Sequence, residues 1–229
     1  MAPGPLFVIG SGPMIGSHIP RLFATHGFTQ VALFSRSADN LARDAAFITT
    51  ASPSTTVHTY AVDVTADDHF ASTLEKAVAE VGSPEVVVYN AARINFAPFG
   101  QYTAADVRRD FEIPNLGLHT TATVLLPRLR ALAESEPEKH PALYVTSAAI
   151  IYQPLMPVYS LCMAKAAQAS LTKVLAEETK GLVHVALVTV GGPVSFEEEF
   201  NNPSNIAIKF WELYQQKKGS WEFEIKCGW

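Results

Sequence analysis

The sequence has few cysteines, little positive charge and no long apolar run, and each shortage excludes a class of protein. Two cysteines, Cys162 and Cys227, are too few for a disulfide framework, and their spacing from histidine does not resemble a metal site. The chain has 17 Lys and Arg against 22 Asp and Glu, so its net charge of −5 offers no general attraction to nucleic acid. Its apolar runs stay far below the roughly 20 residues that span a bilayer, and no basic segment precedes the first of them. We therefore expect a soluble, cytoplasmic protein with no nucleic-acid, membrane or metal partner.

What the sequence does have is a regular alternation of short apolar runs with longer segments of helical periodicity. Hydrophobic residues make up 48% of the 229 residues, which is enough for a sizeable core. Expected strands lie at 5–10, 30–35, 56–63, 85–91, 142–147, 183–190 and 221–227. Expected helices lie at 15–26, 38–49, 66–81, 103–133, 158–180 and 204–216. These units predict a single α/β domain over residues 1–229, with a doubly wound, seven-stranded, mostly parallel sheet flanked by helices.

A glycine-rich turn, GSGPMIG, follows the first expected strand and leads into an apolar helical segment. Glycines in this position permit a tight turn, and the next helix offers free N–H groups and the positive end of its dipole to a phosphate. The pattern is typical of a Rossmann-type dinucleotide site. Its candidate cofactor contacts are Gly10, Ser11, Gly12, Met14, Ile15 and Gly16.

The second expected strand ends in Ser35-Arg36-Ser37. An acidic residue at that point would hold the ribose 2′-hydroxyl of NAD, whereas an arginine pairs with the 2′-phosphate of NADP. Arg36, flanked by the two serines, therefore favours NADP(H). The alternative is an exposed arginine that only begins a helix.

Taken together, the turn and three later segments resemble the short-chain dehydrogenase/reductase family along almost the whole chain. The segments are DVT at 63–65, YNAA at 89–92 and VTVGGPVS at 188–195. The resemblance implies NAD(P)-dependent redox chemistry, with Asp63 at the adenine and Ser195 at the nicotinamide amide. Further cofactor contacts implied by the same matches are Val64, Asn90, Ala91, Ala92, Lys165, Gly192 and Val194. Met14 departs from the family, which has glycine there, and its side chain either folds away or crowds the pyrophosphate.

A larger departure lies in the segment LCMAKAAQASL, which resembles the family's Tyr-x-x-x-Lys helix with Lys165 in place and Leu161 at the tyrosine. The family's tyrosine exchanges a proton with the substrate oxygen, and leucine cannot. Tyr159 replaces it only if the helix begins after residue 160, because six helical residues separate two side chains by 240°. Tyr152 is a weaker candidate on the same loop.

Three more polar residues complete the candidate catalytic set. Ser147 matches the family's active-site serine, although a capping serine would look the same. The family's catalytic asparagine falls on Pro114, which predicts a kink near 113–115 and leaves Asn115 as the possible substitute. Arg93 follows YNAA, where a cation could hold a substrate anion or simply lie in solvent. The predicted catalytic residues are therefore Ser147, Lys165, Tyr159, Asn115 and Arg93.

Three functions are compatible with these residues. The first is an NADPH-dependent reductase acting on a small organic carbonyl, enone or iminium without the usual tyrosine. The second is a non-redox isomerase, lyase or cyclase built on the same scaffold, and the third is a nucleotide-binding protein without turnover. By resemblance, the chain is expected to form a homodimer or homotetramer through the helices at 103–133 and 158–180.

Overall fold

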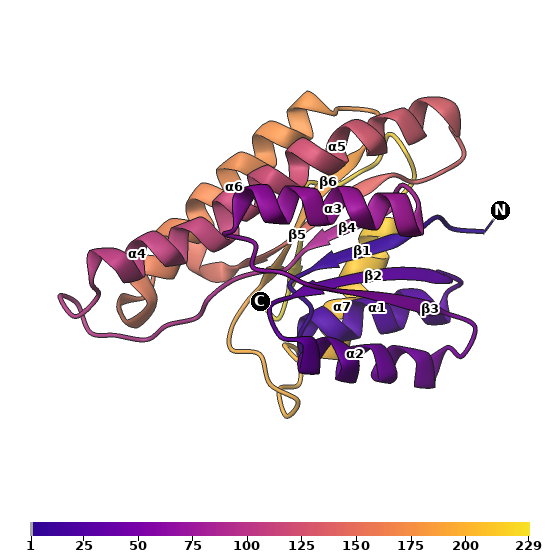
Figure 1. Ribbon diagram of the computed structural model, residues 1–229. Helices are drawn as coiled ribbons and strands as arrows, with labels where there is room; N and C mark the ends of the chain where they lie inside the picture. The colour runs from indigo at the N-terminus through magenta and orange to yellow at the C-terminus, as the bar shows by residue number, and fades with distance from the viewer. Residues whose placement is uncertain (1) are drawn as a thin grey trace.

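The computed structural model describes residues 2–229 and contains one seven-stranded sheet between two layers of helices (Figure 1). The strand order is β3-β2-β1-β4-β5-β6-β7 and every neighbouring pair is parallel. The strands are β1 (Leu6–Ile9), β2 (Gln30–Ser35), β3 (Thr56–Ala61), β4 (Val86–Tyr89), β5 (Ala142–Ala148), β6 (His184–Val190) and β7 (Glu224–Cys227). The predicted doubly wound α/β fold is confirmed, and its sheet is wholly rather than mostly parallel.

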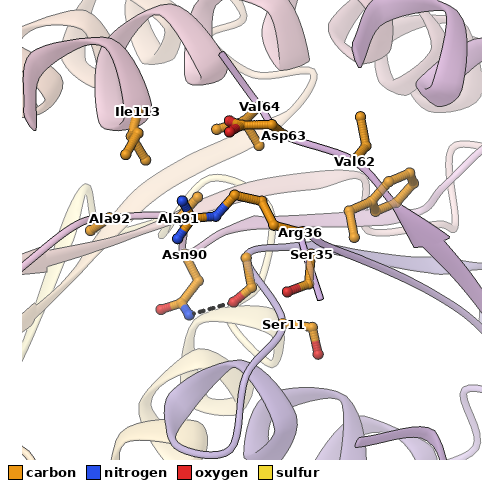
Figure 2. Close-up of a pocket in the computed structure, with 12 residues that line it drawn as sticks. Ser11, Ser35, Arg36, Val62, Asp63, Val64, Asn90, Ala91, Ala92 and Ile113 are labelled. Atoms are coloured by element: carbon orange, nitrogen blue, oxygen red, sulfur yellow. Dashed lines mark hydrogen bonds between the residues drawn. The ribbon is translucent and has the colours of Figure 1, made fainter. Parts of the chain in front are cut away.

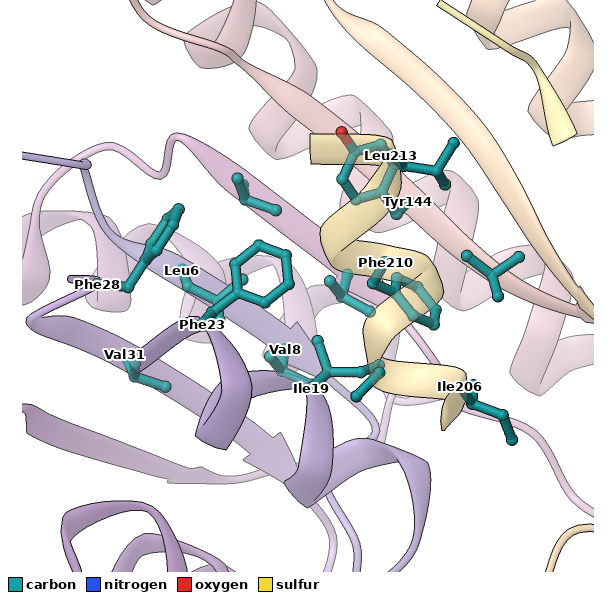
Figure 3. Close-up of a cluster of buried hydrophobic side chains, with 14 of the residues drawn as sticks. Leu6, Val8, Ile19, Phe23, Phe28, Val31, Tyr144, Ile206, Phe210 and Leu213 are labelled. Carbon is teal, nitrogen blue, oxygen red and sulfur yellow. The ribbon is translucent and has the colours of Figure 1, made fainter. Parts of the chain in front are cut away.

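Both faces of the sheet are buried because successive side chains point to opposite sides of each strand. Leu6 and Val8 of β1 join one apolar cluster, while Phe7 and Ile9 join the other. The first cluster is completed by α1 (Ile15–Thr25), α2 (Ala38–Ala51) and α7 (Pro203–Tyr214), as Figure 3 shows for part of it. The second is completed by α3 (Asp67–Val81), α5 (Gly117–Ser135) and α6 (Tyr159–Glu178). Because helices cover both faces, both sets of alternating side chains are buried, which explains why the central strands are continuous runs of apolar residues.

The segment predicted as one helix over 103–133 is divided. It consists of α4 (Ala104–Phe111), a π-helical turn (Glu112–Leu116) and α5. Pro114 has no N–H and its ring would collide with the carbonyl one turn earlier, so a regular α-helix is unfavourable there. A π-helical turn therefore lies where the kink was predicted, near 113–115.

The site is positioned by the reversal of strand order between β1 and β4, which pair with each other in the centre of the sheet. The chain leaves β1 toward β2 and β3 on one side, and leaves β4 toward β5, β6 and β7 on the other. In such sheets the crevice outside the carboxyl ends of the central strands receives the ligand. Within residues 2–229, no helix is both long and apolar enough to cross a membrane.

Candidate active site

A pocket lies in this crevice, at the carboxyl ends of β1, β2, β3 and β4 (Figure 2). It gathers half of the residues predicted to contact a cofactor. The predicted residues that line it are Gly10, Ser11, Ser35, Arg36, Asp63, Val64, Asn90, Ala91 and Ala92. Phe34, Val62 and Ile113 also line it and were not predicted.

Gly10 holds two strand ends together at the floor of this pocket. Its φ of +92° is a left-handed conformation, and an added Cβ would stand 2.5 Å from the backbone nitrogen of Ala91. The Asn90 side chain donates its Nδ2 hydrogen to the Gly10 carbonyl at 2.9 Å, across the two turns. The close approach therefore requires glycine at position 10 for packing, before any ligand is considered.

The turn after Gly10 leaves room for a phosphate. No heavy atom lies within 4 Å of the place where a Cβ of Gly12 would stand, outside its chain neighbours. At α1, no side chain among residues 2–229 caps the first turn, and no acidic residue lies in that turn. The open space and the uncapped positive helix end fit a dinucleotide phosphate. Met14, at the N-cap, is half-buried and does not line the pocket.

The remaining predicted contacts on this side have structural partners. Gly16 needs its missing side chain, because a Cβ would lie 2.4 Å from the Gly10 carbonyl oxygen. Ile15 packs against the first apolar cluster. The Ser37 hydroxyl accepts a hydrogen bond from the Asn40 N–H at 3.2 Å and so caps α2. None of these three lines the pocket itself.

Charged groups stand at the open side of the pocket. The Asp63 carboxylate accepts hydrogen bonds from the Thr65 N–H at 3.0 Å and hydroxyl at 2.8 Å, and pairs with Arg109 at 3.1 Å. Partial burial alone would raise the pKa of Asp63, but these hydrogen bonds and the charges of Arg109 and Arg36 lower it. Arg36 is exposed, makes no hydrogen bond or ion pair with residues 2–229, and extends between Asp63 and Asn90 in Figure 2.

The loop after β6 lies apart from this pocket. Val194 packs against the first apolar cluster, and the Ser195 hydroxyl donates to the Glu197 carboxylate at 2.7 Å. Gly192 is exposed. Their predicted contact with the cofactor, at the nicotinamide amide for Ser195, remains a prediction, since these residues line no part of the pocket that holds Arg36 and Asp63.

Lys165 lies on α6, where only 5% of it is exposed. Its ammonium donates to the Thr146 carbonyl at 2.7 Å and to the Gln168 side-chain oxygen at 2.8 Å. No carboxylate within residues 2–229 lies within ion-pair distance of Lys165. Burial lowers the pKa of Lys165 to about 8. Two of its three hydrogens are thus used inside the protein, which leaves one for a ligand.

Leu161 and Tyr159 stand in the first turn of the same helix. Leu161 is buried in a small apolar cluster with Val158, Cys162 and Ile150. The helix begins at Tyr159, so the condition under which Tyr159 could join Lys165 is not met. Tyr159 instead packs on the rings of Phe99 and Tyr102, with centroid distances of 5.5 and 4.8 Å.

Comparison with known proteins identifies the group to which this arrangement belongs. The family model for short chain dehydrogenases matches residues 6–198. The chain belongs to the short-chain dehydrogenase family. A short chain dehydrogenase/reductase of Claviceps purpurea (strain 20.1) is 32% identical over 166 residues, which cover 72% of this chain and 53% of that protein. The chain thus spans about half the length of this curated relative.

Two solved structures show how far the fold of this short-chain dehydrogenase is shared. A metagenomic short-chain oxidoreductase in complex with NADP superposes with a TM-score of 0.86 at 21% identity, covering 99% of this chain and 97% of that one. An alcohol dehydrogenase from Thermococcus sibiricus complexed with 5-hydroxy-NADP gives a TM-score of 0.85 at 20% identity, covering 97% and 95%. At these identities the likeness establishes the fold alone.

The π-helical turn of this short-chain dehydrogenase is tied to α6 by two amide side chains. Asn115 is buried, and its Nδ2 group donates to the Phe111 and Ala164 carbonyls, both at 3.0 Å. The turn's Pro114 carbonyl accepts a hydrogen bond from Gln168 at 2.9 Å, so Gln168 connects it to Lys165. Asn115 therefore braces the turn, and its side chain makes no hydrogen bond with Lys165.

Ser147 and Arg93 differ in how completely their polar groups are used. Ser147 is the penultimate residue of β5 with 3% exposure, and its hydroxyl has no hydrogen-bond partner within residues 2–229. Arg93 pairs with both Asp106 and Asp110, each at 3.0 Å. The Ser147 hydroxyl therefore has unused hydrogen-bonding capacity, whereas a guanidinium between two carboxylates is largely neutralised.

Tyr144 and Tyr152 are the tyrosines nearest to Ser147 in the chain. Tyr144 is buried in the first apolar cluster, with its hydroxyl 3.2 Å from His184 Nδ1. Tyr152 is 52% exposed and donates to the Glu224 carboxylate at 2.7 Å. Each hydroxyl is therefore already engaged by a protein group.

Sequence analysis missed Gln168 and Arg109, two residues that bind predicted site residues directly. Gln168 lies three residues after Lys165, a spacing that places two side chains on the same helix face and could have indicated the contact. Arg109 lies 46 residues after Asp63, and nothing in the local pattern connects them. Their contacts depend on helix packing that strand-end motifs do not report.

Proposed function

We propose that this short-chain dehydrogenase binds NADP(H) at the carboxyl edge of its sheet and transfers hydride to a small organic acceptor. The observation that carries the proposal is the pocket in which Arg36 stands at the end of β2 without a protein partner among the described residues. A guanidinium at the end of β2 suits a 2′-phosphate. Ser35, Arg36 and Ser37 include no carboxylate, which is the group that would bind a ribose 2′-hydroxyl. NADP or 5-hydroxy-NADP in two similar structures supports the proposal.

The choice of acceptor follows from the residues around Lys165. Leu161 cannot supply a proton, and the Tyr144, Tyr152 and Tyr159 side chains are engaged in other contacts. When bound, the cofactor supplies a hydride with its electron pair, which the carbon of a C=N⁺ group accepts while nitrogen keeps the proton it already carries. An iminium is therefore the proposed acceptor, and a ketone is a poorer one because its oxygen needs a proton.

The chain's own residues orient such an acceptor. The Ser147 hydroxyl has no partner among the described residues and would offer a hydrogen bond to the acceptor, and Lys165 keeps one hydrogen for a ligand hydroxyl. Gln168 and Thr146 fix the lysine so that its orientation is set before binding. Glycine at 12 and the uncapped start of α1 accommodate the phosphates.

The experiment that tests the proposal is titration of the purified protein with NADPH, and separately with NADH, followed by nicotinamide fluorescence. Micromolar NADPH binding, weakened by Arg36→Ala while NADH binding is unchanged, is the expected result. Failure of both nucleotides to bind at millimolar concentration would refute the reductase function. A cyclic iminium and the matching ketone are then offered to the NADPH complex, and faster oxidation of NADPH by the iminium is expected.

A second candidate is nucleotide binding without turnover, which is favoured by the internal hydrogen bonds of Lys165. It predicts tight NADPH binding and no oxidation with any imine, enone or ketone acceptor. A non-redox reaction at Ser147 would instead require turnover without nucleotide. The titration and the acceptor assay together separate these outcomes from the reductase.

Pairing of two copies through α5 and α6 is part of the same proposal. A groove between these helices is lined by His119, Leu126, Leu171 and Leu175 among others, and helix packing of this kind suits a homodimer or homotetramer. Sedimentation equilibrium measures the assembly state directly. A monomer at all concentrations would contradict it.

A further inference from the structure

The second arginine at the cofactor pocket, Arg109, has no assigned role. It lies on α4, one turn before the pocket residue Ile113, and its Nη2 pairs with the Asp63 carboxylate at 3.1 Å. The two side chains are 43% and 31% exposed, so the pair stands at the rim where solvent only partly screens it. Arg109 thus binds the carboxylate that faces Arg36.

Arg36 and Asp63 are opposite charges on two sides of one pocket (Figure 2). The charge of Arg36 contributes to the lowered pKa of Asp63 after the Thr65 hydrogen bonds and the charge of Arg109, so the two groups are close enough to interact. An exposed arginine side chain has several rotatable bonds and can turn toward a free carboxylate. Without Arg109, Asp63 would therefore compete with a phosphate for the Arg36 guanidinium.

We propose that Arg109 is a positioning residue for cofactor choice: it occupies Asp63 and thereby keeps Arg36 available to the 2′-phosphate of NADP(H). The charge count agrees, because Arg36 and Arg109 against Asp63 leave one net positive charge at the rim. Removal of Arg109 brings that sum to zero and lets the remaining two groups neutralise each other. This inference rests on the proposed NADP(H) function.

The test compares dissociation constants of NADPH and NADH for one set of variants, and the readout is their ratio. Arg109→Ala is expected to reduce the preference for NADPH about fivefold, the size of effect that a partly exposed charge pair allows. Arg109→Lys should largely keep the preference. Arg109→Ala combined with Asp63→Asn should restore it, because no carboxylate remains to capture Arg36. Loss of an adenine contact in Asp63→Asn weakens both nucleotides alike and cancels in the ratio.

Arg108→Ala is the matched control, since Arg108 is the exposed neighbour on the same helix and its side chain has no hydrogen-bond or ion-pair partner within residues 2–229. Circular dichroism melting of every variant shows whether the fold is kept. If Arg36→Ala abolishes the preference and Arg109→Ala leaves it unchanged, the inference fails while the proposed function stands. If the double variant does not recover the preference, Arg109 binds phosphate directly and the positioning role is wrong. If Arg36→Ala has no effect on the ratio, the proposed NADP(H) function itself fails.

Discussion

The predicted cofactor end and the predicted catalytic end of the site use their polar residues in opposite ways. At the ends of β1 to β4, the backbone is closely packed around Gly10 while Arg36 is left without a protein partner among the described residues. At the end of β5 and the start of α6, Thr146 and Gln168 accept two of the three Lys165 hydrogens, and Leu161 is buried. The end with Arg36 therefore has a charged group without a protein partner. At the end with Lys165, most of the hydrogen bonds are made within the protein.

This difference teaches that a dinucleotide site and a proton-transfer site can change independently on one fold. The cofactor end depends on turn geometry and on single side chains at strand ends. The catalytic end depends on a proton donor at a given helix position, which one substitution removes. Under the proposed function, hydride transfer to a protonated acceptor needs only the first, so the pocket would keep its use without the second.

The largest effect on the predicted cofactor end is expected from a substitution at Gly10. Gly10→Ala combines a left-handed φ with a Cβ 2.5 Å from a backbone nitrogen, so we expect a loss of about 3 kcal/mol of unfolding free energy and of nucleotide binding. The matched control is Gly219→Ala, where φ is +94° but nothing lies within 4 Å of the added atom. It should cost only about 1 kcal/mol. Equal costs in urea unfolding would show that the close approach to Ala91 does not hold the turn.

At the other end, the buried ammonium of Lys165 predicts a pH effect on stability. Its folded pKa of about 8 lies below the ordinary value of roughly 10.4, so the unfolded chain binds more protons between these values. Stability therefore rises with pH in that window, because the cost of burying the charge disappears as Lys165 loses its proton. At pH 10 the gain should be roughly 2 kcal/mol relative to pH 7.

Lys165→Met isolates this contribution, since other groups that titrate in the same range are present in both proteins. The unfolding free energy of the wild type minus that of the variant should increase from pH 7 to pH 10. A constant difference would mean that Lys165 is hydrated in solution and that the catalytic end is as open as the cofactor end.

Arg93 is the residue whose interpretation changes most between sequence and structure. If it mainly holds Asp106 and Asp110, Arg93→Ala leaves the fully buried Asp110 unpaired and should lower the unfolding free energy by about 2 kcal/mol. The added change Asp110→Asn should recover most of the loss. A variant with unchanged melting and weakened substrate binding would instead support the substrate-binding role predicted from the sequence.

Sequence alone predicted the strands and many of the residues that line the pocket because those features are local. Gly10, Arg36, Asp63 and Asn90 each follow a strand, and parallel strands bring their carboxyl ends to the same edge. The contacts of Lys165 with Gln168, of Arg93 with α4 and of Arg109 with Asp63 could not be predicted. They depend on how helices sit against loops and on the π-helical turn at Pro114, whose width no residue pattern gives.

The smallest expected effects come from two neighbours at the end of β5. Thr146 donates its hydroxyl hydrogen to Asn90 at 2.8 Å, so Thr146→Val should cost about 1 kcal/mol by leaving that acceptor unpaired. Ser147 has no partner for its buried hydroxyl within residues 2–229, so Ser147→Ala should leave the melting temperature unchanged or slightly higher. Differential scanning calorimetry of the two variants decides the matter. If Ser147→Ala lowers the melting temperature as much as Thr146→Val, the Ser147 hydroxyl already contributes to the stability of the fold. If Ser147→Ala does not lower it, the hydroxyl is unused in the fold, as expected of a group that binds a ligand.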